Sequence, residues 1–133
     1  MYTISVSDVL DSGHKLDLPY ESKCNGLHGH CWKVTVEIQS EGLINGMVVD
    51  FIHVKQVLRK YDHKFFLEES SGYNLPGAIL LPFAPTAENL AELFFQEVRR
   101  AVLGLNPSAE VMSVELWETP SGSVVYTPGG SAT

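Results

Sequence analysis

Positive charge is scarce in this sequence, which has 9 lysine and arginine residues against 16 aspartate and glutamate residues and a formal net charge of -7. The basic residues form no cluster or stripe, so the electrostatic footprint of a nucleic-acid-binding protein is missing. We therefore expect no nucleic acid among its partners and a small molecule as its ligand.

Long apolar runs are also lacking. The longest, at 78–81 and 90–95, are far shorter than the roughly 20 residues of a membrane-spanning helix, and no basic-then-apolar leader opens the chain. We expect no membrane partner and a cytoplasmic location.

Cysteine is rare, since Cys24 and Cys31 are the only two. Both lie among histidines in a chain that we expect to be intracellular, so free thiols are favoured over a disulfide. Internal repeats and long linkers are missing too. The 133 residues, 44% of them hydrophobic, suit one compact domain over residues 1–127, followed by a tail at 128–133 that we expect to fray.

Alternating apolar and polar residues predict antiparallel strands at 3–10 and 31–39, and strand character returns at 111–117 and 123–127. Between these two pairs of strands, the spacing of apolar residues becomes helical. The resulting order, ββααββ, predicts an α+β fold in which an antiparallel sheet carries two helices on one face.

The two predicted helices begin after Asp50 and Thr86, whose side chains are suitable N-caps. The segment at 64–83 stays open. Its glycines and proline favour a loop, while residues 79–81 have the composition of a short strand.

His28 and His30 form an HGH motif in which both side chains point to one face of a strand, with Cα atoms roughly 6–7 Å apart. His14 ends the preceding strand, where antiparallel pairing would bring it level with them. Three imidazoles with an open fourth position are typical of a catalytic zinc site. The alternative is that these histidines only form local hydrogen bonds at strand ends.

Cys24 lies across an Asn25-Gly26 turn from this motif, so we expect it to overhang the metal rather than bind it. A thiol near a dication has a lowered pKa, which would make it available as a base or nucleophile. Cys31 follows His30 directly and points to the other face, where we expect it to pack in the core.

Six motifs run in order along nearly the whole chain. They are GHKL at 13–16, CNGLHGH at 24–30, GMVVDF at 46–51, YDHK at 61–64, PTAENLA at 85–91 and ET at 118–119. Together they resemble the 6-pyruvoyl-tetrahydropterin synthase family, and especially its 6-carboxy-tetrahydropterin synthase branch. The resemblance implies a tunnelling fold, in which strands of identical chains join in a ring with active sites at the subunit interfaces, and a hexamer.

The resemblance also implies a reaction. The substrate would be 7,8-dihydroneopterin triphosphate, converted to 6-carboxy-5,6,7,8-tetrahydropterin with release of triphosphate and acetaldehyde, as in queuosine biosynthesis. A 6-pyruvoyl activity on the same substrate is the alternative. A noncatalytic pterin-binding or zinc-stabilised scaffold is a third possibility.

Residue by residue, the resemblance assigns several roles. They are the zinc ligands His14, His28 and His30, the proton acceptor Cys24, the acid/base pair Asp62 and His63, and the pterin anchor Glu118. Thr86 and Glu88 are further candidates for pterin binding, although helix capping alone explains Thr86. The cations that could meet a triphosphate are Lys15, Lys23, Lys33, Lys55 and Arg59.

Overall fold

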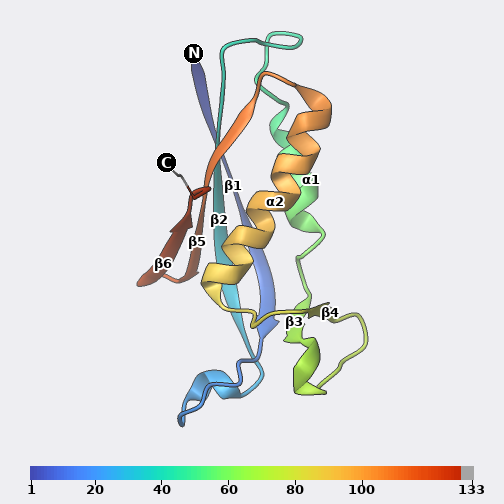
Figure 1. The fold of residues 1–133 in the computed structure, drawn as a ribbon, viewed down its shortest axis with the longest axis vertical. Coiled ribbons are helices and arrows are strands. Elements are labelled where there is room, and N and C mark those ends of the chain that lie inside the picture. Colours follow the sequence, from blue (N-terminus) through green and yellow to red (C-terminus); the bar gives the residue numbers. More distant parts are fainter. Residues whose placement is uncertain (130–133) are drawn as a thin grey trace.

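The computed structural model describes residues 1–129 and shows two helices against a six-stranded sheet (Figure 1). The long elements are β1 (Tyr2–His14), β2 (His28–Ser40), α1 (Phe51–Arg59), α2 (Ala87–Leu105), β5 (Glu110–Thr119) and β6 (Gly122–Tyr126). The short strands β3 (Phe65–Glu68) and β4 (Ile79–Leu81) lie between the helices in sequence. Two 3-10 turns complete the chain, η1 (Lys23–Asn25) and η2 (Glu69–Ser71).

The sheet has the strand order β4-β3-β1-β2-β5-β6. The four long strands are antiparallel, as predicted, and β1 pairs with β2 along its whole length from Tyr2 opposite Ser40 to His14 opposite His28. β3 and β4, in the segment that the sequence left open, add two parallel pairings at one end of the sheet. The predicted α+β class is therefore confirmed, with a mixed rather than a purely antiparallel sheet.

Both helices cover one face of the sheet, as predicted, because each strand directs alternate residues to that face. In β2 the buried residues are Trp32, Val34, Val36 and Ile38, and they join one core with apolar residues of α1 and α2. The predicted caps also form: Asp50 accepts a hydrogen bond from the Ile52 amide, and Thr86 accepts one from the Asn89 amide. In the described part of the chain, no helix is both long and apolar enough to cross a bilayer.

The prediction that Cys31 packs in the core is wrong. Cys31 is exposed, because it lies opposite Asp11 on the face of the sheet that the helices leave open. The neighbouring Asp11 carboxylate raises the pKa of Cys31. Of the tail that we expect to fray, residues 130–133 lie outside the described residues.

Candidate metal centre and active site

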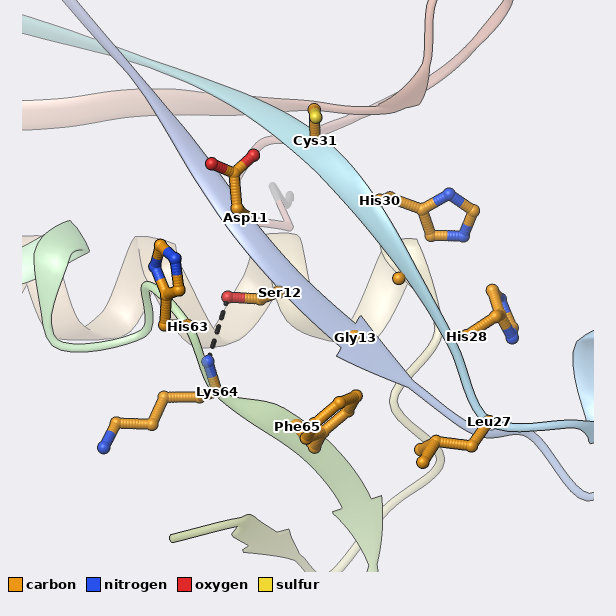
Figure 2. Close-up of a pocket in the computed structure, with 11 residues that line it drawn as sticks. Asp11, Ser12, Gly13, Leu27, His28, His30, Cys31, His63, Lys64 and Phe65 are labelled. Atoms are coloured by element: carbon orange, nitrogen blue, oxygen red, sulfur yellow. Dashed lines mark hydrogen bonds between the residues drawn. The ribbon is translucent and has the colours of Figure 1, made fainter.

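The structure brings His14, His28 and His30 together at one end of the sheet. One ring nitrogen from each lies within 4.8 Å of those of the other two. His14 and His28 are cross-strand partners, and His30 is two residues further along β2 on the same face. In Figure 2, the imidazoles of His28 and His30 project to the same side of β2. The cluster thus follows from strand register and alternation, as the sequence predicted.

Backbone carbonyls fix two of the rings. Nδ1 of His14 donates to the Pro85 carbonyl across 2.7 Å, and Nδ1 of His28 donates to the Gly26 carbonyl across 2.6 Å. A carbonyl can only accept, so Nδ1 carries the hydrogen in both rings and Nε2 of the neutral ring presents a lone pair. This is the usual arrangement of a metal-ligating histidine, whose other nitrogen donates to a fixed partner.

Two of the Nε2 atoms are buried without a hydrogen-bond partner among residues 1–129, those of His14 and His30. Burial lowers the pKa of both side chains, which favours the neutral imidazole that a metal requires. Trp32 packs edge-on against both rings, with ring centroids 4.9 and 5.1 Å away. Buried polar atoms are normally paired, so these orphaned nitrogens fit a metal ion as their missing partner.

Cys24 sits in the η1 turn and is half-buried. Its carbonyl accepts a hydrogen bond from the Leu16 amide, which ties the turn to the segment after β1. The Asn25 side chain closes the loop by accepting from the Leu18 amide. Within the described chain, the group of potential metal ligands contains the three histidines and not Cys24.

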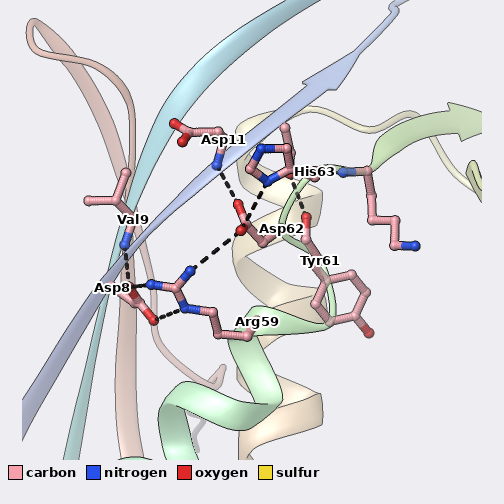
Figure 3. Close-up of polar contacts among 9 residues, drawn as sticks. Asp8, Val9, Asp11, Arg59, Tyr61, Asp62 and His63 are labelled. Atoms are coloured by element: carbon pink, nitrogen blue, oxygen red, sulfur yellow. Dashed lines mark hydrogen bonds and ion pairs between the residues drawn. The ribbon is translucent and has the colours of Figure 1, made fainter.

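Asp62 and His63 follow α1 and lie against the edge of β1 (Figure 3). The Asp62 carboxylate accepts from the Asp11 amide at 2.9 Å and lies 3.1 Å from Nδ1 of His63. The hydrogen bond from Asp11, more than the nearby charges, lowers the pKa of Asp62. His63 adopts the left-handed region at φ 56, and its backbone N–H donates a hydrogen bond to the Asp11 carbonyl. Such strain in a non-glycine residue is common at functional sites.

Arg59 adds a contact to this pair that the sequence did not predict. It is bidentate to Asp8, with both nitrogen–oxygen distances at 3.0 Å, and its third nitrogen lies 3.4 Å from Asp62 (Figure 3). The sequence shows the i, i+3 spacing of Arg59 and Asp62. It does not show the contact of Arg59 with Asp8, because Asp8 lies in β1 and is distant in sequence.

His63 lines an open pocket of about 830 Å³ together with Asp11 and Cys31, and His28 and His30 also contribute to its lining. Figure 2 shows His63 beyond β1, whereas the imidazoles of His28 and His30 extend from the far side of β2. In one chain, the imidazole of His63 therefore does not point toward those of His28 and His30.

Glu118 lies near the end of β5, and its Oε1 is 3.6 Å from Nε2 of His14. The structure thus brings Glu118 to the histidine cluster. Thr86 and Glu88 lie at the start of α2, where Thr86 caps the helix and Glu88 is an acidic residue of the first turn. An acidic side chain at a helix N-terminus is stabilised by the helix dipole, so both residues have a structural role.

Comparison with known proteins identifies the class. The family model for 6-pyruvoyl tetrahydropterin synthase matches residues 3–129, and the chain belongs to this family. It is 30% identical to the 6-carboxy-5,6,7,8-tetrahydropterin synthase of Haemophilus influenzae, over 95% of this chain and 99% of that protein. It is 31% identical to the 6-carboxy-5,6,7,8-tetrahydropterin synthase of Aquifex aeolicus, over 79% of this chain and 76% of that protein.

Solved structures share the fold. The 6-pyruvoyl tetrahydropterin synthase of Caenorhabditis elegans superposes with a TM-score of 0.66 at 24% identity, covering 96% of each chain. That of Plasmodium vivax superposes with a TM-score of 0.72 at 16% identity, covering 95% of this chain and 98% of that chain. The family resemblance in the six sequence motifs is confirmed.

Proposed function

We propose that this protein is a zinc-dependent lyase that converts 7,8-dihydroneopterin triphosphate to 6-carboxy-5,6,7,8-tetrahydropterin, releasing triphosphate and acetaldehyde. The observation that carries the proposal is the three-histidine cluster, with two buried Nε2 atoms that have no partner in residues 1–129. The similarity to proteins named 6-carboxy-5,6,7,8-tetrahydropterin synthase supports this product. We further propose that the reaction serves queuosine biosynthesis in the cytoplasm.

The residues divide the chemistry between them. His14, His28 and His30 hold the zinc, which when bound supplies Lewis-acid polarisation of the substrate's side-chain oxygens. Cys24, in the turn beside this cluster, accepts the proton released from the side-chain carbon. The Glu118 carboxylate accepts hydrogen bonds from two N–H groups on the aminopyrimidinone edge of the pterin.

A second acid/base group is needed to redistribute protons around the pterin ring. His63 supplies an imidazole for this role, and the Asp62 carboxylate 3.1 Å from its Nδ1 orients it. Thr86 and Glu88, at the start of α2, are candidates for further contacts with the pterin, secondary to their capping role.

Assembly is part of the proposal, because His63 and the histidine cluster face different ways in one chain. β1 pairs with β3 only at Gly13 and His14, so the rest of its outer edge has no strand partner in the described chain, and β6 is the opposite edge strand. Open edges of this kind are usually paired. We propose a closed homo-oligomer, a hexamer by family resemblance, in which one subunit's Asp62 and His63 meet a neighbour's Cys24.

Subunit mixing tests this assembly. Cys24→Ala and His63→Ala proteins, each inactive, would be dissociated and reassembled together. Because roughly one site in four would then combine an unchanged Cys24 from one subunit with an unchanged His63 from its neighbour, activity should return. No recovery from verified mixed oligomers would contradict sites built at the interface.

Mass spectrometry of the products tests the reaction. Zinc-loaded protein incubated with 7,8-dihydroneopterin triphosphate should yield 6-carboxy-5,6,7,8-tetrahydropterin and triphosphate. The 6-pyruvoyl product would point to the alternative activity of the family. Binding of the pterin without turnover would favour the third possibility, a noncatalytic pterin-binding scaffold.

A further inference from the structure

The hydroxyl of Ser12 lies between two backbone groups that flank His63. It donates a hydrogen bond to the Tyr61 carbonyl and accepts one from the Lys64 N–H across 3.3 Å, the bond drawn in Figure 2. Ser12 is buried, with 6% of its surface exposed. A hydroxyl can donate once and accept twice, so these two bonds use it in both directions.

The two backbone groups are the ends of the turn between α1 and β3. In a four-residue turn, the first carbonyl often accepts a hydrogen bond directly from the fourth N–H. Among residues 1–129, no hydrogen bond joins the Tyr61 carbonyl to the Lys64 N–H directly. The Ser12 hydroxyl makes a bond to each of them instead, so a side chain of β1 completes the turn.

His63 is the third residue of this turn and has a positive φ of 56. Glycine or asparagine normally occupies such a position, because other side chains disfavour the left-handed region. Asn45 is the other non-glycine residue of the described chain with a positive φ, and the ends of its turn, Ile44 and Met47, bond each other directly in both directions. The turn at His63 lacks that closure, so its conformation depends on β1.

The backbone of β1 supports the same turn. Asp11 donates its N–H to the Asp62 carboxylate and accepts the His63 N–H at its carbonyl, both across 2.9 Å. The support from Ser12 differs, because it comes from a side chain. A substitution can therefore remove it while the backbone bonds of Asp11 stay available.

The carbonyl of Ser12 serves the histidine cluster. It accepts a hydrogen bond from Nε1 of Trp32 across 2.9 Å, and Trp32 packs against His14 and His30. Because this bond uses the backbone of Ser12, a change of its side chain leaves the bond in place. The turn at His63 can therefore be perturbed without removing the support of the proposed metal ligands.

We propose that Ser12 is a positioning residue, which holds His63 in the conformation that its acid/base role requires. This inference rests on the proposed function of His63. Without the hydroxyl, the Tyr61 carbonyl and the Lys64 N–H lose their partner, and the turn relaxes toward a backbone that suits a histidine better. The imidazole then leaves its place beside the Asp62 carboxylate, while the metal centre stays intact.

Steady-state kinetics of the zinc-loaded protein on 7,8-dihydroneopterin triphosphate test this role. Ser12→Ala should lower kcat about tenfold, part of what an acid/base group contributes, with KM and zinc content nearly unchanged. The control is Ser40→Ala, which removes a buried hydroxyl that bonds to the Gly42 carbonyl at the other end of β2. This control should leave kcat unchanged.

A matched pair of variants separates the hydroxyl from the shape of the side chain. Ser12→Thr and Ser12→Val both introduce a β-branched residue of nearly the same shape, and they differ in the hydroxyl. The threonine variant should keep most of the wild-type kcat, and the valine variant should lose it. If circular dichroism shows that Ser12→Ala does not fold, this pair decides.

Hydrogen exchange measured by mass spectrometry tests the turn itself. Peptides that cover residues 60–66 should exchange faster in Ser12→Ala and Ser12→Val than in wild type, while peptides of β5 should not change. Unchanged exchange at the turn, equal kcat in the threonine and valine variants, or a wild-type kcat in Ser12→Ala would overturn this inference alone. A wild type without turnover, or His63→Ala with full turnover, would instead overturn the proposed function and the catalytic role of Ser12 with it.

Discussion

Nδ1 of His14 donates a hydrogen bond to the Pro85 carbonyl across 2.7 Å. His14 ends β1, and Pro85 lies just before α2, so the bond joins two segments that are 71 positions apart in the chain. The bond links the PTAENLA motif, which begins at Pro85, to the histidine cluster, because the Pro85 carbonyl fixes the tautomer of one proposed metal ligand.

Replacement of Gly13 by alanine should damage the end of the β1–β2 ladder. A Cβ there would lie 2.6 Å from the His28 carbonyl oxygen and 2.6 Å from the Phe65 ring, and the backbone oxygen cannot move aside alone. We expect a loss of about 1–3 kcal/mol in the free energy of unfolding, measured with urea. Gly29→Ala, at its cross-strand partner, should be nearly neutral, because the nearest atom lies 3.6 Å away. Equal losses of stability in the two variants would show that the close approach of the His28 carbonyl is not the reason for glycine at position 13.

Cys24→Ala should keep its zinc and its fold while losing turnover. The thiol lies in the η1 turn, outside the group of three histidine nitrogens. Zinc content measured by plasma mass spectrometry should stay near one ion per chain, and kcat should fall by at least about a hundredfold, as for a lost general base. Loss of zinc together with the thiol would make Cys24 a ligand instead.

Arg59→Met should slow turnover without removing zinc. Arg59 lies 3.4 Å from Asp62 and is held in place by its bidentate contact with Asp8. Without it, Asp62 and therefore His63 are less firmly positioned, and we expect about a tenfold lower kcat, part of what an acid/base group contributes. Arg59→Lys should not restore the rate, because an ammonium cannot make the paired contact. An unchanged kcat in Arg59→Met would leave Arg59 a surface ion pair only.

Acid stability should depend on Asp62. The hydrogen bond from the Asp11 amide lowers the folded-state pKa of Asp62 below its unfolded value of about 3.9. The carboxylate thus contributes stability that is fully present above about pH 4 and is lost as pH falls through the folded-state pKa. Between pH 6 and pH 2, the free energy of unfolding measured with urea should fall less for Asp62→Asn than for wild type. Parallel curves would mean that the bond contributes no pH dependence.

The long elements and the histidine cluster were predictable because they depend on local patterns. Alternation placed β2, capping residues located both helices, and the HGH spacing put two imidazoles on one face. β3 was not predictable, because it has only four residues and pairs with the edge of a distant strand. For β4 the sequence left a loop and a short strand at 79–81 both open, and the structure has the short strand.

The sequence also did not determine which face of each strand lies under the helices. The alternation that buries Trp32 also exposes Cys31, but the sequence does not say which face of a strand the helices cover. Arg59 was a candidate for binding triphosphate, and the structure instead pairs it with Asp8 and Asp62. Lys15 is likewise paired with Asp17 at 2.6 Å. These contacts join segments whose proximity only the fold creates.

Anomalous diffraction at the zinc edge tests the central claim most directly. Crystals of zinc-loaded wild type should show one strong peak per chain, bounded by Nε2 of His14, His28 and His30, and His28→Ala should lose most of it, since two remaining imidazoles hold the ion weakly. A chain that binds zinc elsewhere, or His28→Ala crystals with an undiminished peak, would contradict the account.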